Sequence, residues 1–515
     1  MENQFSKKKV SKIKNKFFSL VQEYASSYPG KIVLIDEKSN LKYNWRDCLK
    51  IMQRINRFLE IKKLKPGDTV SSGLPNCIEN TFIFLSCVTY GYNFAALPEK
   101  FSKYEKKKLS KIVKPKITFL NKIITKENIV GEIKISLDSK FSWLPRITKR
   151  KNFIEQNSKI FILSSGTTGE PKVIVQNINN LTLNGQEFLK NHNFVNKNSI
   201  FLNYLSMSYL GGLYNLLILP LLANASIVIT DSFSGITFLN FWKIIARFNI
   251  TCLWLVPTII KGILKLHSKN SEEIKSKFGD KIKYSFVGTA PLEYRIKMDF
   301  QKKFGIVLLE NYGLSETLFI SSENLKTKQN FNTNTSGSII NNVRIKFSSY
   351  KNTFKKILVK TPYIFEGYID EKNLLSKDID SEGFFNTGDL GSNKSNKLSI
   401  TGRVKDIVKK GGFLVNLREI ELIATKIKNV LEASAINVSD DFYGETLVLF
   451  FSSKNKIEIT EKEKIEFEIF KTVTTKLAKQ KWPKKVFLID NLPKTRSGKI
   501  SKFQLKRIYE KFSSK

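Results

Sequence analysis

Short apolar runs separated by helix-like stretches constrain what this chain can fold into more than any other feature. The runs that read as strands cover 31–36, 41–45, 70–74, 225–230 and 251–256, and the helix-like stretches cover 79–90 and 238–248. Alternation of this kind is typical of α/β layers with largely parallel sheets. Gly91, the residue type that commonly ends a helix, follows directly after 79–90. We therefore expect an α/β fold.

The length of the chain indicates more than one domain. One ordinary hydrophobic core does not extend over 515 residues. The sequence pattern changes near Gly402, and Gly411-Gly412 opens a new unit. We expect a large N-terminal domain of layered sheets with flanking helices over 1–403. A small α+β C-terminal domain over 404–515 should be joined to it by a hinge.

Cysteine usage and hydropathy indicate the cellular compartment that we expect for the protein. The cysteines are scattered and form no Cys-x-x-Cys pair, which predicts neither a disulfide framework nor a zinc site: Cys48, Cys77, Cys87 and Cys252. The N-terminus lacks the apolar core of a secretory signal, so we expect a cytoplasmic protein. The longest apolar run, about 214–229, is interrupted by Pro220 and Asn224 and is too short for a membrane span. It should be buried core.

The formal net charge of +40 raises the question of nucleic-acid binding. The lysines are spread along the whole chain, and no zinc finger, RNA-recognition signature or basic zipper is present, so we expect no nucleic-acid partner. Apolar residues at helical spacing from Val10 to Tyr24, with lysines around them, allow two interpretations. The helix could contact a membrane surface peripherally, or it could pack on its own domain, which we favour.

Residues 164–173 read Ser-Ser-Gly-Thr-Thr-Gly-Glu-Pro-Lys-Val and follow the apolar run 160–163. A strand that enters a glycine-rich turn can point consecutive backbone N–H groups at phosphate oxygens. The hydroxyls add donors, and Lys172 adds a positive charge. The spacing is not that of the Walker A loop, because no Gly-Lys-Ser/Thr triplet is present. A plain surface turn is the alternative, which the order ending in Pro171-Lys172 disfavours.

Two segments further along add groups suited to a nucleotide. The turn 287–291 (Val-Gly-Thr-Ala-Pro) is small enough for a flat ring to approach the backbone, although it also fits a structural turn. In the segment 309–317, Tyr312 can stack on a base, Ser315 can donate to a phosphate, and Glu316 can bind Mg²⁺ through oxygen.

Three more segments carry charge where the chain turns. Asp389 follows a Thr-Gly turn and suits vicinal ribose hydroxyls, although Gly-Asp pairs are also common at strand ends. Arg403 can bridge ribose or phosphate oxygens. Lys405 can absorb a domain rotation, and an exposed charged linker is the alternative interpretation. The basic loop 492–500 places Lys499 directly after a glycine, and a generic basic tail is the alternative there.

Taken together, in this order and at these intervals, the segments resemble the adenylate-forming superfamily, which includes acyl-CoA synthetases, adenylation domains of peptide synthetases and beetle luciferases. The resemblance extends from about Phe17 to the C-terminus, and the loop is its most specific part.

The resemblance implies a role for each matching residue. Thr167, Thr168 and Lys172 would hold the β- and γ-phosphates of ATP. Gly411 and Gly412 would line the pantetheine tunnel. The whole set implied for binding ATP and coenzyme A is Ser165, Gly166, Thr167, Thr168, Gly169, Lys172, Gly288, Thr289, Ala290, Pro291, Asn311, Tyr312, Gly313, Asp389, Arg403, Lys409, Gly411 and Gly412.

The same resemblance implies the catalytic groups. Lys499 would be the lysine of the first half-reaction, and Ser315, where the family usually has threonine, would contact the α-phosphate. Glu316 would hold Mg²⁺. Lys405 would be the hinge residue, and Asp389 would bind ribose.

Several positions depart from the family pattern. Val173 stands in place of a glycine and Ile178 in place of a frequent histidine, so the loop should be stiffer. Tyr209 stands where many relatives have a histidine at the acyl pocket, beside Gly211. The stretch around them contains no aspartate to anchor an α-amino group, which favours a fatty or aromatic acid over an amino acid.

The implied function is ATP-dependent activation of a carboxylic acid, fatty or aromatic, to an acyl-adenylate. Thioester formation with coenzyme A follows, with release of AMP and pyrophosphate and with Mg²⁺ as metal. A carboxylate is ionised at neutral pH and needs no general base, and with only His192 and His267 a His-centred hydrolase is hard to assemble. Two alternatives stay open: an acyl-AMP ligase that loads the phosphopantetheine of an acyl carrier protein, and a nucleotide-binding relic without turnover.

Overall fold

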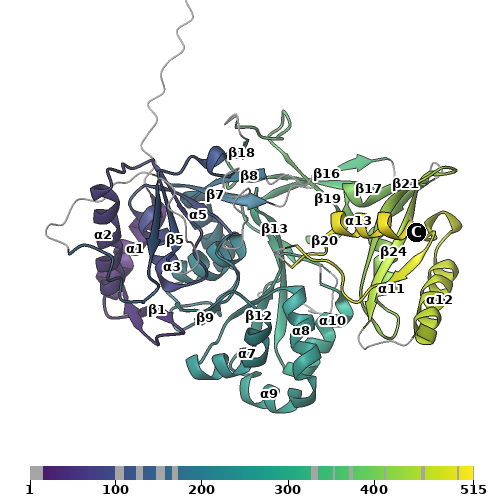
Figure 1. Cartoon of the computed structure of the whole chain (residues 1–515), viewed down its shortest axis with the longest axis horizontal. Coiled ribbons are helices and arrows are strands. Elements are labelled where there is room, and N and C mark those ends of the chain that lie inside the picture. Colours follow the sequence, from purple (N-terminus) through teal and green to yellow (C-terminus); the bar gives the residue numbers. More distant parts are fainter. Residues whose placement is uncertain are drawn as a thin grey trace, which may run out of the picture.

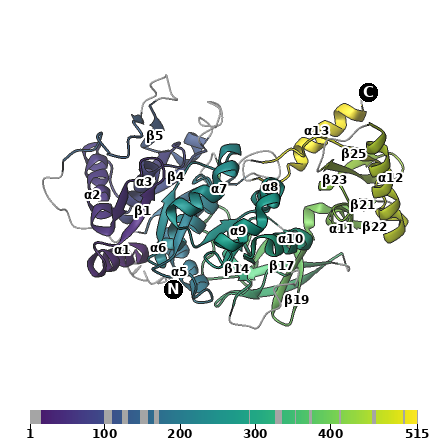
Figure 2. The same cartoon turned by 90° about the horizontal axis from the view of Figure 1, so that it is seen from below.

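The computed structural model describes most of the chain. The described residues are 15–98, 109–122, 131–146, 157–164, 172–290, 292–325, 335–351, 354–370, 375–410, 413–453, 459–495 and 498–513. Figure 1 shows a large unit and, at one end, a smaller unit built from the C-terminal part of the chain. The view from below in Figure 2 shows the same separation. The predicted fold class, a large layered α/β domain followed by a small α+β domain, is confirmed.

Two sheets of the large unit contain the parallel strands that the alternation predicts. The four-stranded sheet has the order β2 (Lys42–Asn44), β1 (Ile32–Asp36), β10 (Ser226–Ile229), β9 (Ile200–Asn203). The seven-stranded sheet has the order β18 (Gly367–Ile369), β8 (Lys172–Asn177), β7 (Lys159–Ser164), β4 (Asn93–Ala96), β3 (Thr69–Ser72), β5 (Ile117–Asn121), β6 (Glu132–Ile135). In the second sheet β8 is antiparallel to both of its neighbours, β7 and β18.

The third sheet corrects the expectation of largely parallel sheets. Its order is β11 (Leu253–Leu255), β12 (Tyr284–Val287), β13 (Val307–Leu314), β14 (Leu318–Ser322), β15 (Ser338–Ile339), β20 (Lys397–Arg403), β19 (Phe385–Lys394), β17 (Phe354–Lys360), β16 (Arg344–Tyr350). Only β11, β12 and β13 are parallel, and all later pairs are antiparallel. Short connections explain three of these pairs, β13 with β14, β16 with β17 and β19 with β20, since strands joined by a tight turn run in opposite directions.

Helices cover these sheets. Those of the large unit include α1 (Lys16–Ser27), α2 (Trp45–Ile61), α3 (Ile78–Thr89), α5 (Ile178–Leu189), α6 (Leu219–Leu222), α7 (Gly235–Phe248), α8 (Pro257–His267), α9 (Ser271–Phe278) and α10 (Tyr294–Phe304). The same unit contains a π-helical turn, η1 (Gly211–Ile218), and a 3₁₀ turn, η2 (Ser268–Asn270). The Asn44 side chain begins α2 with a capping box to Asp47. The run 214–229 is buried core, as expected.

The N-terminal helix α1 packs on its own unit. Phe17 and Val21 are buried, and the Asn15 side chain both caps the helix and donates to the carbonyl of Val88 over 2.7 Å. The packed-helix interpretation therefore holds from Asn15 onward, while Val10 lies outside the described residues. No helix in the described ranges combines the length and the apolar character that a membrane crossing needs.

The small unit has its own sheet and its own core. Its strands are β22 (Phe413–Asn416), β21 (Ile407–Lys410), β24 (Gly444–Ser453) and β23 (Val430–Asp440), with β25 (Val486–Leu488) paired to β24. The helices α11 (Leu417–Ala424), α12 (Ile459–Lys476) and α13 (Lys502–Ser513) flank it, with 3₁₀ turns η3 (Val404–Asp406) and η4 (Lys479–Lys481). None of its apolar clusters shares a residue with the main cluster of the large unit.

Candidate functional site

Asp389 is the centre of a polar cluster on adjacent strands of the third sheet. Asp389 and Arg403 are register partners on β19 and β20, and the Arg403 Nε lies 2.8 Å from Asp389 Oδ1. The Tyr312 hydroxyl on β13 donates to Asp389 Oδ2 over 2.7 Å. Although burial opposes the cation, the Asp389 carboxylate keeps the pKa of Arg403 above its ordinary value. The structure thus brings together three residues that the sequence singled out.

Contacts from the second sheet hold the turn that carries Ser315 and Glu316. The Gln176 side chain on β8 donates to the Ser315 carbonyl over 2.9 Å, and the Phe365 N–H donates to the Glu316 carbonyl over 2.8 Å. The Tyr368 hydroxyl on β18 donates to Glu316 Oε1 over 2.6 Å. Burial and the Glu316 charge raise the pKa of Tyr368, so this partner is neutral and leaves the carboxylate charge for a cation.

A carboxylate in this state fits Mg²⁺. The ion takes oxygen ligands and is usually bound through one or two carboxylates together with substrate phosphates. Glu316, fixed by neutral groups at the end of β13, meets that description.

The turn after β12 lies against β13. The Asn311 side chain donates to the Val287 carbonyl over 2.8 Å. A Cβ at Gly288 would lie 2.5 Å from Asn311 Oδ1, so any larger residue would displace the Asn311 side chain. Thr289 has a φ of 72°, a left-handed conformation that costs about 1 kcal/mol or more for such a residue. Strained backbone of this kind clusters at ligand sites. Ala290 follows Thr289 in the same turn.

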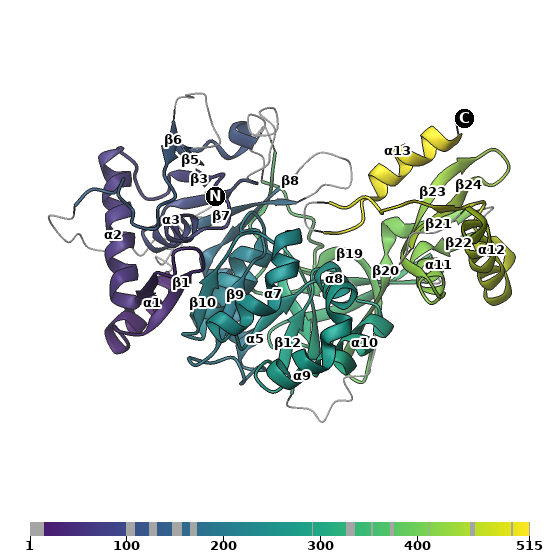
Figure 3. The same ribbon diagram turned by 60° about the horizontal axis from the view of Figure 1, so that its bottom comes forward.

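Lys499 reaches this cluster from the small unit. Figure 3 shows the segment before α13 extending from the small unit toward the large one. The Thr258 hydroxyl on α8 donates to the Gly498 carbonyl over 3.0 Å. Burial by the surrounding protein and then the Arg403 cation lower the pKa of Lys499 to about 8, while Asp389 and Glu316 act in the opposite direction. The side chain still contacts solvent, so it is surrounded by protein without being enclosed.

Comparison with known families assigns the chain. A model described as "AMP-binding enzyme" matches residues 21–369, and a model described as "AMP-binding enzyme C-terminal domain" matches residues 419–499. The chain belongs to the AMP-binding enzyme family. The predicted resemblance to adenylate-forming enzymes is therefore confirmed, and with it the predicted class, an acid–thiol ligase.

Individual relatives are distant but match over nearly the full length. The chain is 25% identical to 4-coumarate–CoA ligase 2 of Nicotiana tabacum, over 94% of this chain and 92% of that protein. The fold is similar to that of ATP-bound MatB from Rhodopseudomonas palustris, with a TM-score of 0.84, 22% identity, and coverage of 96% and 99%. It is also similar to the o-succinylbenzoate CoA synthetase MenE of Bacillus subtilis in complex with its acyl-adenylate, with a TM-score of 0.79, 21% identity, and coverage of 95% and 97%.

The junction between the two units of this AMP-binding enzyme lies beside the cluster. Lys405 is in η3, directly after β20, and burial together with Arg403 lowers the pKa of its ammonium group. Lys502 on α13 makes ion pairs with Asp406 Oδ1 at 3.1 Å and Glu421 Oε1 at 3.0 Å, which ties α13 to the junction. The role of Lys405 as hinge stays a prediction.

Lys409 lies apart from the Asp389 cluster. It is on β21 of the small unit, where its N–H donates to Glu445 Oε2 over 3.1 Å and its side chain is exposed. The structure does not bring it to Asp389. A reorientation of the small unit would be needed for Lys409 to meet a ligand at the same site.

The predicted acyl-pocket residues lie at the start of η1. The Tyr209 ring covers Gly211 so closely that a side chain at 211 would overlap it. Burial raises the pKa of Tyr209, so its hydroxyl is neutral. The Asn76 side chain holds the preceding segment, accepting from the Met207 N–H over 2.9 Å and donating to the Leu205 carbonyl over 2.7 Å. The described contacts place no carboxylate against Tyr209.

Part of the predicted site lies outside the described residues: Ser165, Gly166, Thr167, Thr168, Gly169, Pro291, Gly411 and Gly412. The backbone of Lys172 is described and begins β8, in register with Ser164 at the end of β7. The two ends of the predicted phosphate loop are therefore adjacent. Gly313 lies on β13 beside Tyr312, next to the Leu318 backbone.

A buried charge cluster lies behind β13. Lys297 on α10 is fully buried and contacts Glu310 Oε1 at 2.9 Å and Glu323 Oε2 at 2.8 Å. Glu323 Oε2 also accepts from the Glu310 N–H over 2.8 Å, and His192 contacts the Glu323 carbonyl over 3.0 Å. Burial raises the pKa of Glu323 to about 7 in spite of Lys297. The cluster fixes the strand whose next two residues are Asn311 and Tyr312.

The sequence analysis missed Tyr368 and Gln176. Tyr368 is 52 residues from the carboxylate that it holds, and Gln176 is 139 residues from Ser315. Neither position carries a local signal, because an isolated tyrosine or glutamine in a strand has many structural uses.

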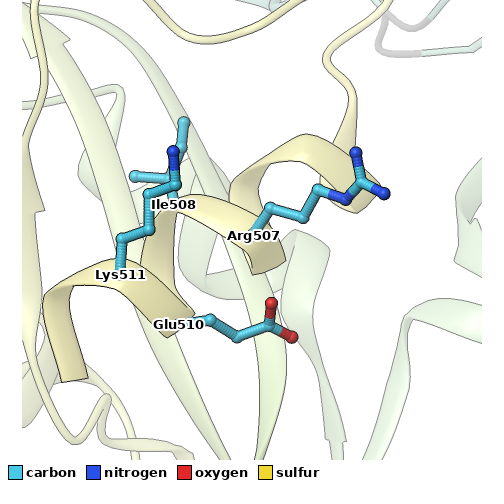
Figure 4. A pocket seen from close by; sticks show the side chains of 4 residues that line it. All are labelled: Arg507, Ile508, Glu510 and Lys511. Atoms are coloured by element: carbon cyan, nitrogen blue, oxygen red, sulfur yellow. The ribbon is translucent and has the colours of Figure 1, made fainter. Parts of the chain in front are cut away.

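A hollow of about 610 Å³ beside α13 does not compete with this site. Figure 4 shows its lining, Arg507, Ile508, Glu510 and Lys511, which all come from that one helix. It combines no groups from different elements that could surround a substrate.

Proposed function

We propose that this AMP-binding enzyme activates a carboxylic acid with ATP to an acyl-adenylate and transfers the acyl group to coenzyme A. The observation that carries the proposal is the Asp389 cluster, with Tyr312 and Arg403 on one carboxylate. Glu316 and Lys499 act electrostatically on the same place from different elements. Five charged or aromatic groups scattered over the chain thus converge where one nucleotide would bind.

The first step forms a bond between a substrate carboxylate oxygen and the α-phosphorus of ATP. The bond from that phosphorus to the oxygen bridging the β-phosphate breaks, and pyrophosphate leaves. No proton is transferred, since the acid is already ionised. Lys499 would neutralise charge on the phosphoryl oxygens, and Asp389 would fix the ribose. Mg²⁺, held by Glu316, supplies further charge neutralisation when bound.

The second step forms the thioester. The coenzyme A sulfur, as thiolate, attacks the acyl carbon, and the bond from that carbon to the AMP oxygen breaks. The thiol proton is lost to solvent and AMP leaves as the anion. The exposed position of Lys409 on the small unit supports a different orientation of that unit for this step, because it lies away from the cluster in the present one.

Within the predicted fatty or aromatic range we favour an aromatic acid, because of the names of two relatives. The described contacts place no carboxylate against Tyr209 to hold a substrate ammonium, and its hydroxyl is neutral, which disfavours an amino acid but does not separate fatty from aromatic acids. The tobacco and Bacillus relatives named above carry aromatic acids in their names.

Pyrophosphate release with a panel of acids tests the proposal. Aromatic, fatty and amino acids are offered with ATP and Mg²⁺, and we expect release with an aromatic acid. Lys499→Ala should lower this rate by about 10²–10³. Lys511→Ala, which removes an exposed lysine of α13, is the matched control and should leave it unchanged. If the protein binds ATP tightly but releases pyrophosphate with none of the acids, the result would instead support the alternative of a nucleotide-binding protein without turnover.

A second assay decides which thiol accepts the acyl group. With the active acid, coenzyme A and a phosphopantetheinylated carrier protein are offered separately, and we expect thioester with coenzyme A. Thioester with the carrier protein alone would establish the acyl-AMP ligase alternative.

A further inference from the structure

Glu432 lies at the contact between the two units and faces a lysine from each. It is on β23 of the small unit and is 8% exposed. Its Oε1 lies 3.7 Å from Nζ of Lys261 on α8 of the large unit. Its Oε2 lies 2.9 Å from Nζ of Lys494, at the start of the loop that carries Lys499. The carboxylate therefore joins the large unit to the base of the catalytic loop.

The loop itself is held closed between these contacts. Lys494 pairs with Ile500 in an antiparallel bridge, and the Thr495 N–H donates to the Lys499 carbonyl over 2.6 Å. Fixing Lys494 therefore fixes the backbone of Lys499 a few ångströms away.

The same helix, α8, contacts the loop a second time. The Thr258 hydroxyl donates to the Gly498 carbonyl over 3.0 Å, and Thr258 and Lys261 are three residues apart and share a face of α8. Lys261 is also paired with Glu293 of its own unit at 2.9 Å. Two carboxylates and two ammonium groups thus balance in charge at this contact.

The surroundings of Lys499 act on its charge in both directions. Burial and the cations of Arg403 and Lys405 lower the pKa of its ammonium group, whereas Asp389 and Glu316 raise it. Because these effects oppose one another, contacts at the base of the loop can contribute to the preference for this orientation.

We propose that Glu432 is a positioning residue that latches the small unit in the orientation for adenylation, by linking Lys261 of the large unit to Lys494 of the Lys499 loop. The inference rests on the proposed function. It predicts that the two half-reactions respond differently to the loss of Glu432, because thioester formation does not need Lys499 in this place.

Glu432→Gln tests the latch with little change in shape. Lys261 keeps Glu293 as partner, and Lys494 is 31% exposed and can be rehydrated, so folding should be preserved. We expect pyrophosphate formation to fall by about tenfold, the size of effect typical for a charge-assisted contact. Thioester formation from supplied acyl-adenylate and coenzyme A should stay within about twofold of the parent.

Two further variants make the test specific. Lys261→Met removes the large-unit partner and should lower the same half-reaction, and the double variant with Glu432→Gln should be no worse than about the poorer single one, since both break one link. Glu419→Gln is the matched control: it breaks the ion pair with Lys481 at 2.7 Å, which lies entirely within the small unit. It should change neither half-reaction.

A distance measurement gives a readout besides activity. Spin labels on Lys275→Cys of α9 and Lys479→Cys of the small unit, in a Cys77→Ser background, report the relative position of the two units. We expect one dominant distance in the parent and a broader distribution in Glu432→Gln.

The outcomes separate the latch from the proposed function. An equal fall in both half-reactions, an unchanged adenylation rate, or an unchanged distance distribution would overturn the latch. If the parent adenylates no acid, the proposed function fails, and the distance distributions still decide whether Glu432 holds the two units together.

Discussion

Replacing Asp389 by asparagine removes one charge from the cluster and almost no volume. The side chain is 2% exposed, and each oxygen already accepts one bond, from Arg403 at 2.8 Å and from Tyr312 at 2.7 Å. A carboxylate offers about four acceptor positions, so two remain for the hydroxyls of a ribose. The amide keeps one acceptor oxygen and turns the other atom into a donor.

The size of the effect follows from these bonds. In the variant, Arg403 can still donate to the amide oxygen, and the Tyr312 hydroxyl can rotate to accept from the amide nitrogen. The arrangement of the three side chains should therefore be preserved. A ribose hydroxyl then loses a charged acceptor, which should weaken the binding free energy of ATP by about 1.5–3 kcal/mol. We expect the KM for ATP to rise by about 10- to 150-fold, since each 1.4 kcal/mol is a factor of ten. The KM for the acid should not change.

Pyrophosphate exchange with ATP and with 2′,3′-dideoxy-ATP measures this directly. The parent should discriminate strongly against the dideoxy nucleotide, and Asp389→Asn should lose most of that discrimination. Tyr312→Phe keeps the ring but removes one hydrogen bond to the Asp389 carboxylate, a charged acceptor, so it should weaken ATP binding by at most about 1.5–3 kcal/mol. If Asp389→Asn discriminates between the two nucleotides as well as the parent does, Asp389 does not bind ribose.

Three other perturbations give distinct signatures. Glu316→Gln should raise the Mg²⁺ concentration for half-maximal adenylation by at least about tenfold, while Tyr368→Phe should raise it less. If Glu316→Gln and the parent need the same Mg²⁺ concentration, Glu316 does not hold the ion. Binding of ATP near pH 8 should be accompanied by proton uptake, because the negative charge of ATP raises the pKa of Lys499 from about 8. Calorimetry in two buffers of different ionisation enthalpy measures the uptake, which should vanish in Lys499→Ala. Burial raises the folded-state pKa of Glu323 to about 7, so the folded state binds its proton more tightly than the unfolded chain, and stability is lost as the pH rises from about 4.5 to 7. The stability of Glu323→Gln relative to the parent should therefore rise by about 1–3 kcal/mol between pH 5 and pH 8, and thermal denaturation showing the same difference at both values would refute this.

Local patterns predicted the elements and the family, because both depend on residues close in sequence. The apolar run 225–230 became β10, and the stretch 79–90 became α3 with Gly91 in the left-handed conformation. The motif residues Tyr312, Asp389 and Arg403 lie in contact, as the resemblance to the family implied. Their individual roles stay predictions.

What the sequence did not predict depends on pairing across long distances. The antiparallel part of the third sheet needs the order in which β14 to β20 pair, and period-two patterns carry no information on partners. Lys261 and Glu432 are two charged residues among many in a lysine-rich chain, and only their 3.7 Å separation distinguishes them. The boundary predicted at 403/404 coincides with the start of η3, but the position of the hinge needs a second orientation to be tested.

The kind of contact between the two units is compatible with the proposal that Lys499 serves only the first of the two steps. Each unit has its own apolar core, and the described side-chain contacts between α8 or α10 and the small unit are polar, through Thr258, Lys261 and Arg295. Polar contacts near the surface exchange for water at a net cost of about 1 kcal/mol each, whereas separating apolar surfaces would cost about 25 cal/mol for every Å² exposed. In the proposed reaction, a few polar links would therefore be strong enough to hold Lys499 at the phosphate while ATP reacts, and weak enough to be released once pyrophosphate has left. An apolar contact at Lys261 would shift this balance: we expect it to hold the small unit in place and to slow thioester formation more than adenylation.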